Sequence, residues 1–441
     1  MKPFSYLKKH IEYALEEQTY NEADFEGETY KEIMVDDDIY YERGMDNSEG
    51  ISINTEYLII NGDGHDVDLN FQTEAFLVSS DMVILKNFNF KNGRGHQGGV
   101  IHNTGSLRIE NCTFSDCKAL NGGAIYNEGF LVVDKCNFEN NSTTYHLGDG
   151  GAILNKFISM IFNSNFINNH SENNGGAIFS DKYLMADNCF FKRNSARLDG
   201  GTIKNKGFLS FGIFFEDSSN KWNVNVSKKG IIKNCLFEDS EGRVIRTSED
   251  LDIENCTFRR CKDIISIHSS RINITDCLFE NNSSYLIDNT YSTVINSIVR
   301  LENCHFINNG SKVLNHLPLF ESSLFKIYVK DKYWNVKNCS FENNVSNYLF
   351  DCSSIHLSLD DVTFEGNDFE VLLRDTSNSK DDVELKLDNV TFNEKSENII
   401  SCNCDLQIND CKFLKHQKIN GESVLDIYDS ERKFIDKLND D

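Results

Sequence analysis

Apolar and polar positions recur along this chain in one repeated arrangement. In the stretch Gly122–Ser142, Leu131 and Val133 lie two residues apart, and so do Cys136 and Phe138, with a polar shift between the two pairs. A two-residue period indicates strands, because alternate side chains of a strand point to the same face. Each unit is therefore predicted to hold about two or three strands of roughly three to five residues, joined by Asn, Asp or Gly corners.

A phenylalanine two residues after the cysteine position marks the period of the repeat. Neighbouring markers are mostly about 21 to 28 residues apart, and a period in this range indicates a solenoid. The markers are Phe90, Phe114, Phe138, Phe166, Phe191, Phe215, Phe237, Phe258, Phe279, Phe306, Phe341, Phe364, Phe392 and Phe413.

A single unit of this length cannot bury its own apolar face. Stacked units bury that face and pair each backbone N–H and C=O with the turn above or below. The sequence therefore predicts an all-β fold, a single-stranded right-handed parallel β-helix of about 14 coils, because crossovers between parallel strands are right-handed.

The two ends of the chain carry candidate caps. Phe4, Leu7, Ile11 and Leu15 fall on one helical face, so residues 4 to 17 are predicted to form an amphipathic helix that covers the first coil. A second cap is expected over Asp429–Leu438.

These features divide the chain into three predicted parts. Residues 1–48 form the N-terminal cap, residues 49–415 the parallel β-helix and residues 416–441 a C-terminal coil and cap. Two stretches, near 216–230 and 311–335, lack the repeat and are interpreted as insertions.

The strongly negative net charge of the chain limits the kinds of molecule that it is expected to bind. The 441 residues include 69 acidic and 44 basic ones, a formal net charge of −25, which repels a phosphate backbone and argues against nucleic acid. Uncharged glycans and protein surfaces remain as partners. No window approaches the ~18 apolar residues of a membrane span, and Lys8, Lys9 and Glu12 interrupt any signal-peptide core. The expected location is the cytoplasm, or the cell surface if an unrecognised route exports the protein.

The 14 cysteines occupy mostly one phase of the repeat, as in NCTF at Asn111–Phe114 and KCNF at Lys135–Phe138. One cysteine per unit at a constant phase is typical of a small buried apolar side chain that stacks on itself. There is no CxxC pair, so zinc is not expected. Cys402 and Cys404 share a strand face and are a weaker candidate metal site beside the same core interpretation.

Several motifs resemble known β-helix families. GGAI at Gly122–Ile125 with FENN at Phe138–Asn141, and GGAI at Gly150–Ile153 with FINN at Phe166–Asn169, resemble the repeats of chlamydial polymorphic outer-membrane proteins. They look still more like the adhesin-like β-helix proteins of methanogenic archaea. The entry segment Glu49–Asn70 resembles the first coil of pectate-lyase-like folds.

The resemblance covers roughly residues 50 to 413. It implies a right-handed parallel β-helix and an adhesive role. Those families usually carry a signal peptide, a transporter domain or a wall anchor, and none is visible in this sequence.

Candidate chemistry lies in the loops that precede each GG pair. Hydrolases of this fold need carboxylates gathered on one strand face, and their usual motifs are not found. Lyases of this fold use a basic residue to remove the proton beside a uronate carboxylate, usually with calcium. Because each loop immediately precedes a GG pair, its residues should line one edge of the solenoid; the alternative is that they are solvated corner residues. The candidates are Arg94, His96, His146, Asp149, Arg197 and Asp199.

Exposed aromatic residues are the second candidate for ligand binding. Trp222, Tyr333 and Trp334 fall in the two insertions and could stack on sugar rings or anchor a protein. The alternation around Trp222 equally suits an added strand.

Two further patterns have structural interpretations. The glycines of NGDGHD, Asn61–Asp66, allow a corner with positive φ, which competes with a calcium site. The asparagines that end each FxxN motif are predicted to stack as an amide ladder at an inner corner. They are Asn141, Asn169, Asn194, Asn282 and Asn309.

The sequence therefore predicts a non-enzymatic, adhesin-like β-helix protein that presents an elongated surface to a glycan or protein partner, with no cofactor and no metal. A carbohydrate-active enzyme, either a polysaccharide lyase or a glycoside hydrolase, is the first alternative. Its signature would be three or more carboxylates that converge with a His, Lys or Arg on one strand face. An intracellular scaffold is the second alternative.

Overall fold

The computed structural model describes residues 1–42, 50–206, 230–240, 243–247, 250–267, 271–288, 298–310, 323–327, 332–352, 355–375, 384–394, 396–401, 405–414, 416–420 and 422–423. The chain is an all-β parallel β-solenoid of about 12 turns, which confirms the predicted fold class. The predicted coil number, about 14, was slightly too high. Of the marker residues, Phe215 lies outside the described residues, and beside Phe413 only an isolated bridge pairs Lys412 with Thr391.

The chain forms two compact units. Unit 1 comprises Met1–Gly230 and Ser240–Ile245, and unit 2 comprises Ile231–Asp239 and Arg246–Asp441. In each unit the strands of successive turns stack in parallel into three sheets, called sheets 1, 2 and 3 below.

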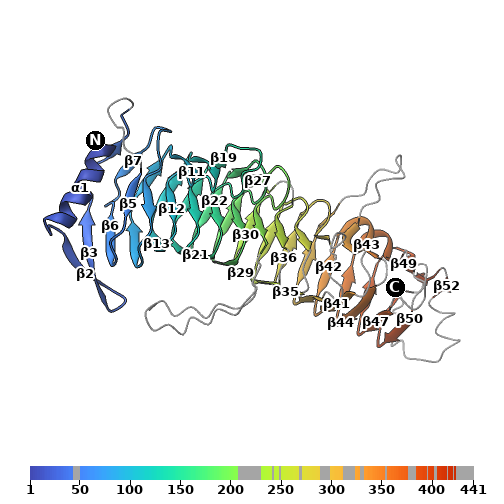
Figure 1. Ribbon diagram of the computed structural model, residues 1–441. Helices are drawn as coiled ribbons and strands as arrows, with labels where there is room; N and C mark the ends of the chain where they lie inside the picture. Colours follow the sequence, from blue (N-terminus) through green and yellow to red (C-terminus); the bar gives the residue numbers. More distant parts are fainter. Residues whose placement is uncertain are drawn as a thin grey trace. The chain divides into compact units, whose positions relative to one another are not determined.

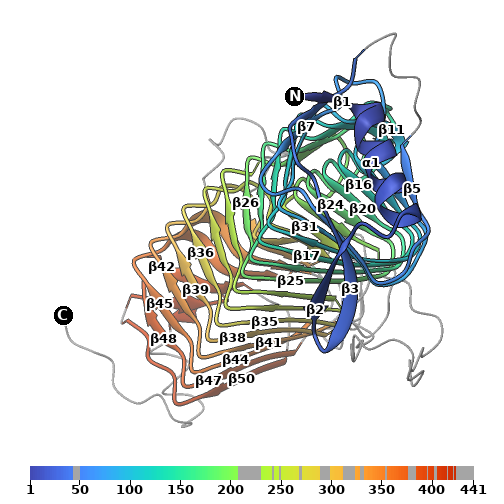
Figure 2. The same ribbon diagram turned by 90° about the vertical axis from the view of Figure 1, so that its left-hand side faces the viewer.

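Unit 1 has three stacked sheets and a fourth, shorter one (Figures 1 and 2). Sheet 1 consists of β1 (Lys2–Pro3), β4 (Ile39–Tyr40), β7 (Asp66–Asp68), β10 (Asn89–Lys91), β14 (Thr113–Ser115), β18 (Asn137–Glu139), β22 (Asn165–Ile167) and β26 (Phe190–Lys192). Sheet 2 consists of β5 (Ile51–Ile53), β8 (Phe76–Val78), β12 (Ile101–Asn103), β16 (Ile125–Asn127), β20 (Ile153–Asn155), β24 (Ile178–Ser180) and β28 (Ile203–Asn205). Sheet 3 consists of β2 (Asn21–Phe25), β3 (Glu28–Met34), β6 (Leu58–Asn61), β9 (Val83–Lys86), β13 (Ser106–Glu110), β17 (Phe130–Asp134), β21 (Ile158–Phe162) and β25 (Tyr183–Asp187). The rim sheet consists of β11 (Arg94–Gln97), β15 (Lys118–Asn121), β19 (Ser142–Thr143), β23 (His170–Ser171) and β27 (Ser195–Ala196).

The N-terminus of unit 1 is capped as the sequence predicts. Helix α1 spans Phe4–Glu16 and lies across the N-terminal end of the stack (Figure 1), where it packs against β1 and β4. Its buried residues are Phe4, Leu7, Ile11 and Ala14, so the fourth apolar contact comes from Ala14 rather than from Leu15. The antiparallel hairpin β2–β3 follows, and Tyr30 packs there against the outer face of sheet 3.

Unit 2 repeats the three sheets without a rim sheet among its described residues. Sheet 1 consists of β30 (Leu236–Glu238), β33 (Thr257–Arg259), β36 (Leu278–Glu280), β39 (His305–Ile307), β42 (Ser340–Glu342), β45 (Thr363–Glu365) and β48 (Thr391–Asn393). Sheet 2 consists of β31 (Ile245–Thr247, which begins in unit 1), β34 (Ile265–Ile267), β37 (Ile287–Asp288), β40 (Ser323–Ile327), β43 (Val345–Cys352), β46 (Asp368–Asp375), β49 (Asn398–Ser401), β51 (Lys418–Ile419) and β52 (Glu422–Ser423). Sheet 3 consists of β29 (Gly230–Lys233, whose first residue belongs to unit 1), β32 (Leu251–Glu254), β35 (Arg271–Thr275), β38 (Ile298–Glu302), β41 (Lys332–Lys337), β44 (Ile355–Asp360), β47 (Glu384–Asp388) and β50 (Asp405–Asn409).

The marker phenylalanines stack on one another inside the coils. The ring centroids of Phe114 and Phe138 are 4.8 Å apart and those of Phe138 and Phe166 are 4.7 Å apart, with nearly parallel planes. In unit 2 the rings of Phe258 and Phe279 are 4.9 Å apart. The spacing equals the distance between paired strands, so in-register strands place each ring directly on the next.

The corners of each coil use left-handed residues. Around β14, Asn111 and Asp116 have φ values of 51° and 57°; around β36, Asp276 and Asn281 have values of 54° and 55°. Asn and Asp tolerate this region better than other non-glycine residues do. Most of the left-handed non-glycine residues that flank the short strands of sheet 1 are Asn or Asp, with Lys135, Arg193 and Arg260 as exceptions, and they set the two bends that close a turn.

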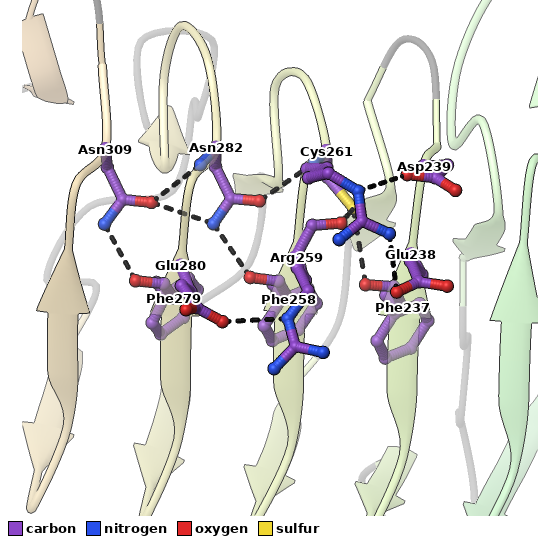
Figure 3. Close-up of polar contacts among 11 residues, drawn as sticks. Phe237, Glu238, Asp239, Phe258, Arg259, Cys261, Phe279, Glu280, Asn282 and Asn309 are labelled. Atoms are coloured by element: carbon purple, nitrogen blue, oxygen red, sulfur yellow. Dashed lines mark hydrogen bonds and ion pairs between the residues drawn. The ribbon is translucent and has the colours of Figure 1, made fainter.

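The predicted asparagine ladder is present in both units. In unit 1 the Nδ2 atoms of Asn141 and Asn169 each donate to the Oδ1 of the next asparagine, at 3.0 Å, up to Asn194. Figure 3 shows the same arrangement in unit 2, where Asn282 donates to Asn309 at 2.9 Å and to the carbonyl of Phe258. These side chains are at most 2% exposed, so the ladder satisfies buried polar groups and binds no ligand.

The cysteines of the described residues are buried free thiols. Most donate to the carbonyl of the residue two positions earlier, as Cys136 does to Asp134 at 3.3 Å. Burial raises the pKa of Cys117 to about 12 and that of Cys411 to about 11. Cys402 and Cys404, the CxC pair, lie outside the described residues.

We therefore expect the thiols of Cys117 and Cys411 to resist alkylation. Iodoacetamide at neutral pH should modify neither in the folded protein and both in denaturant, because only the exposed thiolate reacts. Peptide mass spectrometry measures this. Rapid labelling of either cysteine under native conditions would contradict the buried stack.

Two predictions about the second insertion need correction in its described part. Residues 311–322 lie outside the described residues, whereas β40 and the start of β41 take regular places in sheets 2 and 3 of unit 2. Trp334 is fully buried, so the expectation of an exposed ring is wrong for this residue. Neighbouring side chains of a strand point to opposite faces, so Trp334 points into the coil and Tyr333 points outward. Trp222, residues 216–229 of the first insertion and the C-terminal cap at Asp429–Leu438 lie outside the described residues.

Candidate functional site

The loops before the GG pairs stack at one edge of unit 1, as their position in the repeat predicts. The N–H of Gly122 donates to the carbonyl of Asp149 at 2.9 Å, and that of Gly175 donates to the carbonyl of Asp199 at 2.9 Å. An isolated parallel bridge joins Asn174 to Asp199. Successive turns therefore place Asp149, Asn174 and Asp199 in one column beside the rim sheet.

The six candidate residues of this edge fall into two groups. Asp149 and Asp199 are partly buried, whereas the other four are exposed. The exposed residues are Arg94, His96, His146 and Arg197.

Asp149 accepts several hydrogen bonds from the next turn of the solenoid. Its Oδ1 accepts from the Nδ2 of Asn173 at 2.9 Å and from the backbone and side-chain nitrogens of Asn174 at 3.1 and 2.8 Å. Burial raises the pKa of Asp149, although these bonds and the charge of Lys206 oppose the rise. Asp149 therefore ties two coils together and also faces the cations described next.

The outer face of sheet 2 beside this column carries a line of side chains that the sequence analysis did not single out. Tyr126, Leu154, Phe179 and Lys204 occupy the same register position on β16, β20, β24 and β28. Their neighbours in the strand point inward, so these four point outward. All four are nonetheless less than 10% exposed.

Lys204 is the most unusual member of this line. It is 6% exposed, and its Nζ lies 3.6 Å from Oδ2 of Asp199. No described residue accepts a hydrogen bond from it at normal distance. Burial, reinforced by the charges of Lys206 and Arg243, lowers the pKa of Lys204 to about 8, and Asp149 partly opposes this.

Three further cations surround Lys204. The Nζ of Lys206 and of Lys156 lie 4.7 and 5.9 Å from the centroid of the Phe179 ring, within the range of a cation–π contact. Lys156 also pairs with Asp181, whose hydrogen bond and charge outweigh burial and raise the pKa of the lysine. Arg243 donates to Oδ1 of Asp199 at 2.8 Å.

We call Lys156, Lys204, Lys206 and Arg243 the cation cluster. Three carboxylates, those of Asp149, Asp181 and Asp199, interact with it. The face thus has one more positive than negative charge within a chain of net charge −25. The cluster gathers carboxylates with lysine and arginine, as expected of a carbohydrate-active site. Only Lys204 stands on a strand of sheet 2, however, and the other six side chains come from residues that flank its strands.

The sequence carries a signal for this face in the repeated GG motif. In the motif GG-φ-Ile-x-Asn, which has Ser180 in place of the Asn in one unit, the Ile and the last residue point inward, so the residue x points outward. At that position stand Tyr126, Leu154, Phe179 and, in TIKNK, Lys204. A lysine at position x therefore stands on the outer face of sheet 2, because the residues on both sides of it point inward.

The aromatic candidate Tyr333 lies on sheet 3 of unit 2. It is 45% exposed, and its ring stacks on that of His356 at 4.7 Å with an angle of 11°. On its other side the register partner is Ile298. Because both ring faces point along the stack of strands, Tyr333 presents an edge and a hydroxyl to solvent rather than a flat platform.

The segment Asn61–Asp66 forms a corner. Gly64 has a φ of 84°, and the backbone N–H of Asp63 donates to the side chain of Asn61. His65 pairs with Asp38 at 3.1 Å. Among the residues that the structure describes, no group of three or more His, Cys, Asp and Glu side chains could hold a metal ion. In the same residues no helix is long and apolar enough to span a membrane.

Comparison with known proteins supports the repeat. Residues 135–156 and 163–181 match the Chlamydia polymorphic membrane protein repeat, which confirms the resemblance seen in the sequence. No curated protein matches the chain.

Two solved structures are similar in fold. A mannuronic-acid-specific polysaccharide family 6 lyase from human gut microbiota is 12% identical, covers 77% of this chain and 81% of its own, and has a TM-score of 0.33. A mutant of AlyGC, an alginate lyase of the same family, is 10% identical, covers 88% of this chain and 78% of its own, and has a TM-score of 0.26. At these values the likeness says nothing about activity.

Proposed function

We propose that this β-helix repeat protein binds an acidic glycan, a polymer that carries uronate carboxylates, on the cation cluster of unit 1. The observation that carries the proposal is Lys204. A buried ammonium normally has a close hydrogen-bonding partner, because an unpaired buried charge is costly. The Nζ of Lys204 lies 3.6 Å from Oδ2 of Asp199, a carboxylate that also accepts from Arg243, so a carboxylate of a bound ligand supplies the close partner that Lys204 lacks among the described residues.

Charge explains why the ligand is acidic although the protein is acidic too. At physiological ionic strength, exposed charges are screened beyond roughly 8 Å. A ligand carboxylate at the cluster therefore interacts with Lys156, Lys204, Lys206 and Arg243 more strongly than with the distant acids of the chain. The regular spacing of the coils, about 4.8 Å, also suits an extended polymer laid along them.

A second candidate function, uronate elimination, is favoured by the lowered pKa of Lys204. In its neutral form the amine takes the proton from C5 of a uronate, the C4–O bond breaks, and a C4–C5 double bond forms. The leaving oxygen takes up a proton, and a cation such as Arg243 balances charge on the carboxylate. Binding alone needs only the charged lysines and leaves the glycan unchanged. Elimination yields an unsaturated uronate, so the two functions differ in their products.

One panel of polysaccharides tests both functions. We expect the protein to bind polyuronates and not neutral glucans, and to bind less tightly as salt rises. Lys206→Met should weaken binding about tenfold, since a hydrogen bond to a charged group contributes about 1.5–3 kcal/mol. Lys9→Met, which removes an exposed lysine of α1, is the matched control and should bind as the wild type does.

The same panel separates binding from elimination. Ultraviolet absorbance from unsaturated uronate, lost in Lys204→Met, identifies a lyase; binding without new absorbance identifies a binding protein. Equal binding to neutral and acidic polymers would contradict both functions.

The proposal includes a place of action at the cell surface. It is supported by the description of the matched repeat, which is that of a chlamydial membrane protein. Protease treatment of intact cells tests it: loss of the full-length protein is expected, and full protection in sealed cells would contradict it.

A further inference from the structure

Exposed apolar side chains gather beside the cation cluster. Among the described residues, the exposed large apolar side chains are those of Met1, Tyr13, Tyr145, Leu147, Leu198 and Tyr333. Three of them stand on two loops of the edge described above. Tyr145 is 44% exposed, Leu147 58% and Leu198 65%.

Hydrogen bonds to Gly148 hold the loop that carries Tyr145 and Leu147 in one conformation. The N–H of Gly148 donates to the carbonyl of Tyr145 at 2.7 Å. The carbonyl of Gly148 in turn accepts from the buried hydroxyls of Thr143 at 3.3 Å and Ser171 at 2.8 Å. A Cβ at Gly148 would come within 2.2 Å of the carbonyl oxygen of Leu120, so only glycine fits. The turn thus holds its apolar side chains outward at a fixed place.

Leu198 belongs to the same surface. Its N–H donates to the carbonyl of Asn173 at 2.9 Å, and the N–H of Asn173 donates to the carbonyl of Gly148 at 3.0 Å. Three consecutive turns therefore align the two loops. We call Tyr145, Leu147 and Leu198 the apolar rim.

Asp149 joins the apolar rim to the cation cluster. It follows Gly148 directly, and its charge acts on both Lys204 and Lys206. The apolar rim therefore adjoins, in the chain, a carboxylate that interacts with two lysines of the cation cluster.

We propose that the apolar rim is a sugar-stacking subsite, which takes the C–H face of a pyranose that neighbours the uronate held by the cation cluster. The inference rests on the proposed function and deepens it: the ligand is an oligosaccharide of at least two units, recognised by charge at one unit and by apolar contact at the next.

The size and chemistry of the rim favour a sugar over a protein. A stable protein interface needs about 800 Å² on each partner, far more than three side chains present. The C–H face of a pyranose is small and apolar and carries hydroxyls at its edge. An exposed tyrosine, apolar in body and polar at its tip, suits both features.

The test compares ligand lengths. With wild-type protein, an oligouronate of four units should bind more tightly than a single uronate, because only the oligomer reaches the rim. Tyr145→Ser should weaken binding of the oligomer about three- to tenfold and leave binding of the single uronate unchanged, whereas Tyr145→Phe keeps the ring and should bind normally. Tyr13→Ser, which removes a still more exposed tyrosine on α1, is the matched control.

The outcomes separate this inference from the function on which it rests. If Tyr145→Ser and Leu198→Asn both bind the oligomer as the wild type does while Lys206→Met does not, the rim is overturned and acidic-glycan binding stands. If the wild type binds neither the oligomer nor the single uronate, both proposals are overturned. Circular dichroism of each variant confirms that a loss of binding is not a loss of fold.

Discussion

Asn169→Ala is expected to lower the free energy of unfolding of unit 1 by about 4 kcal/mol. The Oδ1 of Asn169 accepts from the backbone N–H and the Nδ2 of Asn141, each at 3.0 Å. Its own Nδ2 donates to the carbonyl of Phe138 and to Oδ1 of Asn194. Alanine removes all four bonds and leaves buried polar groups unpaired, at about 1–3 kcal/mol each.

Urea denaturation followed by circular dichroism measures this loss. The matched control is Asn137→Ala, because Asn137 lies on the outer face of β18 and makes an exposed contact with Asn165. Its effect should stay within about 0.5 kcal/mol. Equal effects of the two substitutions would show that the inner ladder does not hold the corner together.

Glu394→Gln is expected to stabilise unit 2 at pH 8 by up to about 3 kcal/mol. Glu394 takes the place of an asparagine at the end of the unit 2 ladder, where Asn367 donates to its Oε1 at 2.5 Å. It is 1% exposed, and its Oε2 has no hydrogen-bond partner among the described residues. Burial raises the pKa of Glu394 from its usual value of 4.5 to about 7, and the charge of Glu365 adds to the rise.

The sign of the pH dependence follows from this raised pKa. Below pH 4.5 the carboxyl is protonated in both states. Between pH 4.5 and 7 the unfolded chain releases the proton while the folded chain keeps it, so the free energy of unfolding falls by about 1.4 kcal/mol per pH unit. Above pH 7 the full loss, about 3 kcal/mol, is reached. Glutamine keeps the acceptor for Asn367 and has no such loss.

Denaturation of wild type and Glu394→Gln at pH 4, 6 and 8 checks the prediction. The two proteins should be nearly equally stable at pH 4 and diverge as the pH rises. Glu365→Gln is the control: Glu365 is exposed, so its removal should change the pH dependence only slightly. A difference that is the same at every pH would contradict a buried protonated carboxyl.

The interior of the solenoid could be predicted because one residue type per position repeats. Phe138 and Phe166 follow their cysteine positions by two residues, and Asn141 and Asn169 follow these phenylalanines by three. In-register stacking turns such a sequence period into a spatial one. The core, the ladder and the left-handed corners follow from that period alone.

The candidate site could be predicted only in part. The column of Asp149 and Asp199 follows from their place before the GG pairs. Lys204 was missed because its burial depends on neighbours in other coils, not on its own surroundings in the sequence. Trp334 was misplaced for the opposite reason: the stretch around it lacks the repeat motif, although its strand occupies a regular place in sheet 3.

The core could be predicted better than the candidate site for a physical reason. A core position is repeated in every turn, so its pattern is visible many times. The proposed binding position occurs once, where the outward residues Phe179, Lys204 and Lys206 of different turns meet.

The central claim is that carboxylates of a glycan occupy the cation cluster of unit 1. Calorimetric titration at pH 7 with an oligouronate, and with the same oligosaccharide after reduction of its carboxylates to alcohols, tests this claim most directly. We predict saturable binding of the acidic form, loss of at least tenfold in affinity in Lys204→Met with Lys206→Met, and no binding of the reduced form. Equal affinity for the two forms, or unchanged affinity in the double variant, would contradict it.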